Sequence, residues 1–124
     1  KLIEHLSKDG HTLVDAEESF DADLVTRKDG EKHFSEAEVK TAWTGDWPTH
    51  WAEIRIPERK KKLLSKHTNN LKFYVFSGDM SKAWCIDSSL LTDDKLKEAS
   101  GRNIYQGEQF YHVPYTEAQL INVA

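Results

Sequence analysis

Charged side chains recur at every other position along the segment EAEVK, where Ala37 and Val39 separate Glu36, Glu38 and Lys40. Residues two apart in a β-strand point to the same face of a sheet. A strand here would place two carboxylates and an ammonium group on one face. Carboxylate oxygens suit Mg²⁺ or Mn²⁺, and a lysine beside them can hold or activate a water molecule. The spacing therefore predicts metal-assisted hydrolysis of a phosphodiester.

A further carboxylate lies upstream, at Asp23, directly before a short apolar run. That run predicts a strand over residues 22–27, and a second strand is predicted over residues 33–42. A turn containing Asp29 and Gly30 separates them, so we expect an antiparallel hairpin. Asp23, at the end of the neighbouring strand, would then complete the acidic cluster.

The elements that must position this cluster follow from periodicity and from helix and turn signals. Helices are expected over residues 1–8, 56–67, 93–100 and 116–121, further strands over 11–16, 71–77, 83–87 and 109–113, and irregular chain over 43–54. This order predicts a mixed α/β or α+β fold. At 124 residues the chain is expected to be a single domain, with a central mixed β-sheet flanked by helices.

Composition narrows the class of protein. Hydrophobic residues make up 38% of the chain and charged residues 31%, as in globular domains. Neither a membrane-spanning run nor a signal-peptide pattern is recognised. The single cysteine, Cys85, excludes an internal disulfide and favours a reducing compartment, so a cytoplasmic protein is expected. A net charge of -4 argues mildly against nonspecific binding of nucleic acid.

Asp23 in DADLV and Glu38-Val39-Lys40 in EAEVK resemble the signature of the PD-(D/E)XK nuclease superfamily, which includes restriction enzymes and Holliday-junction resolvases. The resemblance covers residues 1–87 and leaves 88–124 as decoration on a restriction-endonuclease-like core. It implies that Asp23, Glu38 and the backbone carbonyl of Val39 bind Mg²⁺ or Mn²⁺, with Glu4 as a further candidate ligand. It also implies that Lys40 orients or deprotonates the attacking water.

The chain departs from the family pattern in places. Ala22 replaces the proline before the aspartate, and Asp21 and Glu36 compete with Asp23 and Glu38 as ligands. The literal motif also recurs in ERK and DDK, at residues 58–60 and 93–95, but both lie in predicted helices, where residues two apart do not share a face. The alternative for EAEVK is a solvated edge strand whose alternating charges oppose aggregation.

Two other segments carry candidate binding residues. The most basic stretch could contact phosphates, and its members are Arg59, Lys60, Lys61, Lys62 and Lys66. The alternative is an ordinary solvated helix face. Tryptophans at positions 43, 47 and 51 could stack on an unpaired base or form a subunit contact, although packing in the core or a loop is the simpler interpretation.

Together these features predict a divalent-metal-dependent endonuclease that hydrolyses DNA. A domain this small would need a homodimer to cut both strands. Two alternatives remain open: a nucleic-acid-binding or assembly domain that keeps the nuclease fold without cleavage, and a small α+β interaction module.

Overall fold

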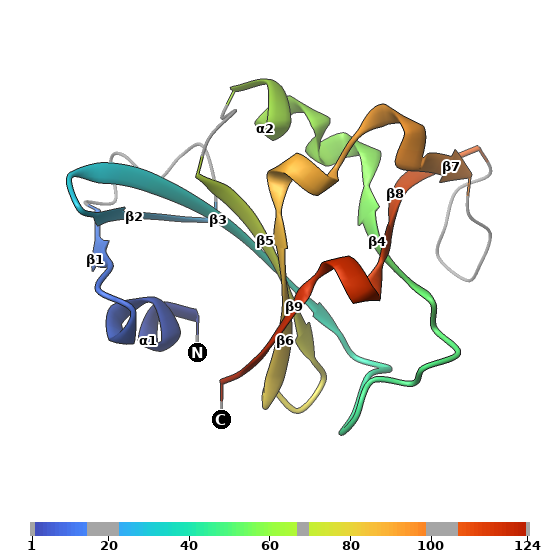
Figure 1. The fold of residues 1–124 in the computed structure, drawn as a ribbon, viewed down its shortest axis with the longest axis horizontal. Coiled ribbons are helices and arrows are strands. Elements are labelled where there is room, and N and C mark those ends of the chain that lie inside the picture. The colour runs from blue at the N-terminus through green and yellow to red at the C-terminus, as the bar shows by residue number, and fades with distance from the viewer. Residues whose placement is uncertain (1, 15–22, 67–69, 99–106, 124) are drawn as a thin grey trace.

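Two β-sheets and two short α-helices make up the described part of the chain (Figure 1). The computed structural model describes residues 2–14, 23–66, 70–98 and 107–123, without the side chains of Arg59 and Lys66. The elements in chain order are α1 (Leu2–Lys8), β1 (Thr12–Leu13), β2 (Leu24–Lys28), β3 (Glu31–Lys40), β4 (Glu53–Pro57), η2 (Glu58–Lys60), α2 (Lys61–Lys66), β5 (Leu71–Ser77), β6 (Lys82–Asp87), η3 (Ser88–Leu90), η4 (Asp93–Lys95), β7 (Leu96–Glu98), β8 (Gln109–Pro114), η5 (Tyr115–Glu117) and β9 (Gln119–Asn122), where η denotes a 3-10 helix.

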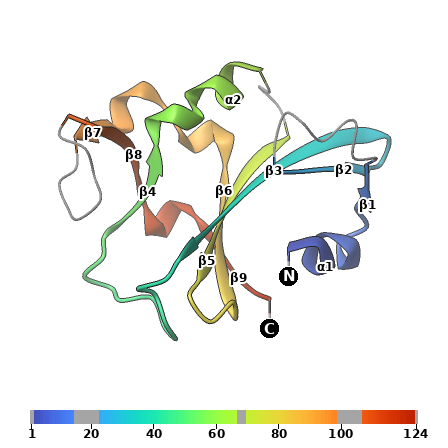
Figure 2. The same cartoon turned by 180° about the vertical axis from the view of Figure 1, so that it is seen from behind.

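The larger sheet is mixed, as the sequence predicts. Its six strands run in the order β1-β2-β3-β5-β6-β9, and only the β3–β5 pair is parallel. The connection between these two parallel strands contains β4, η2 and α2. β4 then pairs with β8, and β8 with β7, to form a separate three-stranded antiparallel sheet. Figure 2 shows this smaller sheet beside the larger one from behind.

The β2–β3 hairpin confirms the turn predicted from sequence. Lys28 pairs with Glu31, which leaves Asp29 and Gly30 as a two-residue loop. Both loop residues have positive φ, 53° and 80° respectively. Asp-Gly is a preferred sequence for such loops because both residues tolerate this backbone conformation, which matches the twist of the flanking strands. This local turn sets the hairpin register, and with it the face to which each β3 side chain points.

β5 is buried on both of its faces and divides the core in two. Phe73 and Val75 pack in the main core between the two sheets, together with residues of β4, β6 and β8. Tyr74 and Phe76 point the other way and pack against Leu2 and Leu6, the buried residues of α1. The dense apolar run that predicts β5 therefore reflects two separate contacts, one with each neighbouring layer.

Several sequence-based expectations are wrong. The expected helix at Ile56 begins later, because residues 53–57 form strand β4 against β8. The helices expected over 93–100 and 116–121 are 3-10 turns, η4 and η5, followed by strands β7 and β9, in the described part of each range. The central sheet is not flanked by helices: the smaller sheet packs against one face, and only short α1 and α2 accompany the strands in the described ranges.

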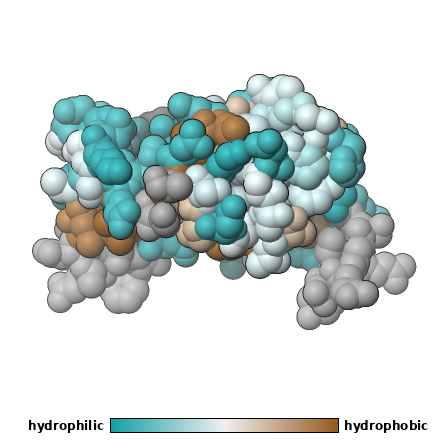
Figure 3. Space-filling view, turned by 90° about the horizontal axis from the view of Figure 1, so that it is seen from below, coloured by the Kyte–Doolittle hydropathy of each residue, from teal (hydrophilic) through white to brown (hydrophobic). Residues whose placement is uncertain are grey.

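Large hydrophobic side chains are exposed at separated points, namely Ile3, Leu13, Val39 and Leu120. Figure 3 shows a mainly hydrophilic face with isolated hydrophobic patches. No helix in the described ranges is long and apolar enough to cross a membrane.

Candidate functional site

The hairpin register places Asp23 next to Glu36. Leu24 pairs with Ser35 at the last position of the β2–β3 ladder, so Asp23 lies one residue beyond it, opposite Glu36. Two hydrogen bonds close this end of the ladder. The Asp23 backbone N–H donates to Glu36 Oε2 at 2.6 Å, and the Ala37 N–H donates to Asp23 Oδ2 at 2.9 Å. Asp23 is therefore held against β3 through its backbone N–H as well as through its side chain.

The parallel pairing of β3 with β5 shows which face the charged residues share. Glu36 aligns with Phe73 and Glu38 with Val75, and both partners belong to the main core. Since alternate residues share a face, Lys40 lies on this side as well. Asp23, Glu36, Glu38 and Lys40 therefore occupy one face of the larger sheet, as the alternation predicts.

Glu36 forms a clamp that sequence reasoning did not foresee. Lys60 Nζ donates to Glu36 Oε1 at 2.8 Å, while Glu36 Oε2 accepts from the Asp23 backbone. The Glu36 side chain is only 7% exposed and that of Lys60 is 26% exposed. We call Asp23, Glu36 and Lys60 the Glu36 clamp. It joins the start of β2 and the end of η2 to the middle of β3, and it uses the carboxylate that competes with Glu38 for the role of metal ligand.

Glu38 and Lys40 have different surroundings. Glu38 is exposed and forms no hydrogen bond or ion pair with another described residue. The ammonium of Lys40 lies over the ring of Trp51, 5.2 Å from its centroid, in a cation–π contact. Across the described ranges, no group of three or more His, Cys, Asp or Glu residues is arranged to hold a metal ion. Any cation here would depend on Asp23, Glu38, a carbonyl oxygen and water.

Glu4 lies apart from this face. It is exposed on α1, whose buried residues pack against Tyr74 and Phe76 on the opposite side of the larger sheet. The structure therefore does not bring Glu4 together with Asp23 and Glu38.

The predicted basic helix is divided between several partners. Lys60 belongs to the Glu36 clamp, and Lys61 lies 3.6 Å from Asp93 in an exposed ion pair. Lys62 is exposed and forms no ion pair with another described residue. The side chains of Arg59 and Lys66 fall outside the described set. Of the three described lysines, only Lys62 presents its charge to solvent without an acidic partner.

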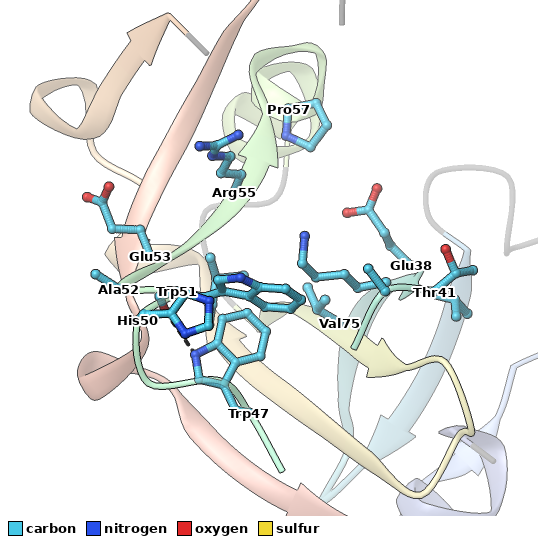
Figure 4. A pocket seen from close by; sticks show the side chains of 14 residues that line it. Glu38, Thr41, Trp47, His50, Trp51, Ala52, Glu53, Arg55, Pro57 and Val75 are labelled. Carbon is cyan, nitrogen blue, oxygen red and sulfur yellow. Dashed lines mark hydrogen bonds between the residues drawn. The ribbon is translucent and has the colours of Figure 1, made fainter. Parts of the chain in front are cut away.

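A large cavity opens beside Glu38 and Lys40. Its volume is about 860 Å³, within the range usual for small-molecule sites. Figure 4 shows Trp51 between a side that carries Arg55 and Glu53 and a side that carries Glu38 and Thr41. The full lining comprises Glu38, Val39, Lys40, Thr41, Ala42, Trp47, His50, Trp51, Ala52, Glu53, Ile54, Arg55, Pro57 and Val75.

Sequence reasoning did not predict that Glu53 and Arg55 line a cavity, because it did not recognise the strand that carries them. The alternation of Glu53 and Arg55 with Ile54 and Ile56 is a strand signal that could have revealed β4. The two isoleucines are buried in the main core. Glu53 pairs with His112 of β8 at 3.4 Å, whereas Arg55 has no ion-pair partner in the described ranges.

The tryptophan segment, residues 43–51, is packed at one end and exposed to the cavity at the other. Trp43 is fully buried and meets Trp47 edge-to-face, with 5.1 Å between ring centroids. Trp47 in turn meets Trp51, with 5.3 Å between centroids. The expectation that these residues pack is therefore confirmed for Trp43, while Trp51 forms part of the cavity wall.

The turn between β5 and β6 holds this segment in place. The Gly78 N–H donates to the Trp43 carbonyl at 2.6 Å, and Lys82 Nζ lies 2.7 Å from a carboxylate oxygen of Asp46. A Cβ at position 78 would come within 2.7 Å of the Thr41 carbonyl oxygen, so the close approach requires glycine. Hydrogen bonds from Ser77 and Ser81 to Asp79 order the same turn and lower the pKa of Asp79 to about 2.

Cys85 lies on the opposite side of the larger sheet, beside Tyr74. Burial raises the pKa of its thiol, so little thiolate forms near neutral pH. This agrees with the sequence-based interpretation of Cys85 as a small packed side chain and not a nucleophile.

In comparisons with known proteins, no family model, no curated protein and no solved structure matches the chain.

Proposed function

We propose that the protein is a divalent-metal-dependent endonuclease that hydrolyses DNA phosphodiester bonds, with a restriction-endonuclease-like arrangement of α1, β1, β2, β3, α2 and β5. One observation carries the proposal. Asp23, Glu38 and Lys40 lie on a single face of the sheet, and Glu38 and Lys40 line a cavity large enough for part of a nucleic-acid strand. Carboxylates and a lysine on one face are among the groups that metal-assisted phosphodiester hydrolysis uses, and this supports the proposal.

Asp23 and Glu38 offer the type of donor atom that Mg²⁺ and Mn²⁺ prefer. Oxygen ligands suit both ions, and Mg²⁺ is usually bound through one or two carboxylates together with water and substrate phosphate. The Glu38 carboxylate and the second carboxylate oxygen of Asp23 form no hydrogen bond with another described residue. These two side chains, with the Val39 carbonyl, would hold the ion. When bound, it would act as a Lewis acid that stabilises the charge that develops on the phosphate.

The chain's own groups have distinct roles in this proposal. The Lys40 ammonium orients the attacking water and offsets negative charge as the water oxygen bonds to phosphorus, and the proton of that water passes to bulk solvent. The bond from phosphorus to the leaving oxygen then breaks, and that oxygen takes up a proton. The Glu36 clamp positions Asp23, because it fixes the Asp23 backbone against β3. Cleavage of both DNA strands would involve a homodimer that supplies two such sites.

Lys40→Ala tests the catalytic role. Removal of one positioned group that stabilises charge in the transition state typically costs about 10²–10³-fold in rate. We expect cleavage of DNA in Mg²⁺ or Mn²⁺ to fall by about this factor, while affinity for continuous duplex DNA measured in Ca²⁺ changes little. Linear, branched and single-stranded substrates should be compared. Lys72→Ala is the matched control, since Lys72 is an exposed strand lysine that pairs with Ser35 and points to the opposite face.

A non-catalytic nucleic-acid-binding domain is the second candidate. It is favoured by the contact of Lys40 with Trp51, because an ammonium engaged with a ring is not free to act on water. DNA binding without cleavage by the unmodified protein would support this candidate. A cleavage rate unaffected by Lys40→Ala would refute the role proposed for Lys40.

A further inference from the structure

The wall of the cavity that faces Lys40 is aromatic and rigid. Trp47 Nε1 donates to the Trp51 carbonyl oxygen at 2.9 Å, and the Trp51 N–H donates to the Pro48 carbonyl oxygen at 2.9 Å. The ring of Trp47 also packs between Trp51 and buried Trp84. The indole of Trp51 is thus held in place before any ligand arrives, which reduces the entropy that binding would cost.

Two cationic side chains line the cavity together with this indole. Arg55 lies on the same wall and is exposed, without an ion-pair partner in the described ranges. Lys40 lies over the ring from the opposite wall. The cavity therefore offers a flat π surface for stacking together with an ammonium and a guanidinium for an anion. A nucleotide combines these two features, since its base is flat and its phosphate is anionic.

The acidic side chains of the cavity do not prevent this binding. The Glu53 carboxylate is already in contact with His112, whose Nδ1 lies 3.4 Å from Glu53 Oε1. Glu38 is a proposed metal ligand, and a bound divalent cation would offset its charge. The electrostatic balance therefore favours a phosphate when a divalent ion is present, and binding should be stronger in Ca²⁺ than in a chelator.

We propose that this cavity binds one unpaired nucleotide of a DNA strand, with its base stacked on Trp51 and its phosphate beside Arg55 and Lys40. The inference rests on the proposed function, because it names the part of the substrate that the nuclease site recognises. A base inside a continuous duplex is stacked on its neighbours and cannot reach the indole face. The site thus selects single strands, flaps and frayed ends over continuous duplex.

Stacking also changes the position of Lys40. A base that occupies the indole face displaces the ammonium from Trp51, since both contact the same ring. Lys40 is then free to face the phosphate and the attacking water. Occupancy of the stacking site in this way prepares the lysine for its catalytic role.

The test is fluorescence anisotropy in Ca²⁺ with two labelled DNAs, a short single strand and a blunt hairpin. The unmodified protein should bind the single strand more tightly. Trp51→Leu keeps an apolar side chain but removes the π surface, and should weaken single-strand binding by about 5- to 100-fold. Trp51→Phe keeps a ring and should retain most of the affinity. Thr49→Ala, an exposed change in the same segment, should have no effect.

Equal affinity for both DNAs, or equal losses with Trp51→Leu and Trp51→Phe, would overturn the inference. Thermal melts of each variant show whether a loss reflects unfolding, and Trp51→Phe provides the folded comparison. The two proposals fail in different ways. Duplex cleavage that depends on Lys40 but not on Trp51 would refute the proposed stacking site and support the proposed nuclease activity. Trp51-dependent binding of the single strand without any cleavage would refute the proposed nuclease activity and support the proposed stacking site.

Discussion

The Glu36 clamp leads to a prediction about stability. Lys60→Met removes the ammonium but keeps much of the aliphatic chain, so among the described residues it leaves buried Glu36 with the Asp23 N–H as its one hydrogen-bond partner. Removal of one member of a fully buried ion pair costs about 3–5 kcal/mol. Lys60 is 26% exposed and Glu36 keeps one hydrogen bond, so a smaller loss is expected. We predict that the free energy of unfolding falls by about 2 kcal/mol.

Urea denaturation measures this loss directly, and the melting temperature should fall by about 6–10 °C. Lys62→Met is the matched control. It lies on the adjoining helix α2, is exposed and has no ion-pair partner in the described ranges, so a change within about 0.5 kcal/mol is expected. When Glu36→Gln is already present there is no buried charge to neutralise, and Lys60→Met should then cost much less.

Two results would refute this reasoning. One is an equal cost of Lys60→Met in the presence and in the absence of Glu36→Gln, because the two side chains would then not be coupled. The other is a loss of DNA affinity with no loss of stability, because Lys60 would then act on phosphate, as its place in a basic stretch suggests.

Two further predictions concern metal linkage and acid stability. Millimolar Mg²⁺ or Mn²⁺ should raise the melting temperature, because an ion that binds only the folded state stabilises that state. Asp23→Asn should abolish this increase. An equal increase in the variant would show that the ion binds elsewhere. The pKa of Asp79 is lowered from 3.8 to about 2 by hydrogen bonds from Ser77 and Ser81, so its contribution to stability is complete above about pH 4 and is lost as the pH falls towards 2. Asp79→Asn should therefore lose less stability than the unmodified protein between pH 4 and pH 2 in urea titrations, and identical pH profiles would contradict the assignment.

Local signals in the sequence account for the hairpin and for the face that its charges share. The Asp29-Gly30 loop and the alternation over β3 depend only on neighbouring residues, so both are readable without the fold. Asp23, Glu38 and Lys40 lie on one face for this reason. Local signals do not show whether Glu36 or Glu38 is available as a metal ligand. That depends on Lys60, which approaches Glu36 from a separate element and pairs with it.

The expected helices at 93–100 and 116–121 were wrong for a physical reason. Short isolated helices are marginal in water, and tertiary contacts decide whether they form. Here β7 pairs with β8 and β9 pairs with β6, so neighbouring strands supply the backbone hydrogen bonds of the described residues. In the described part of these ranges, helical structure is limited to the single 3-10 turns η4 and η5.

The sequence by itself determined the alternating faces of β3, the tight turn before it and the buried character of β5, because these properties depend on side-chain order along one strand. Only the tertiary structure decided that β4 and β8 form a second sheet, that Lys60 neutralises Glu36 and that Trp51 faces Lys40. These contacts join segments far apart in the chain. Their free energy depends on which surfaces meet after folding, and no local pattern specifies that.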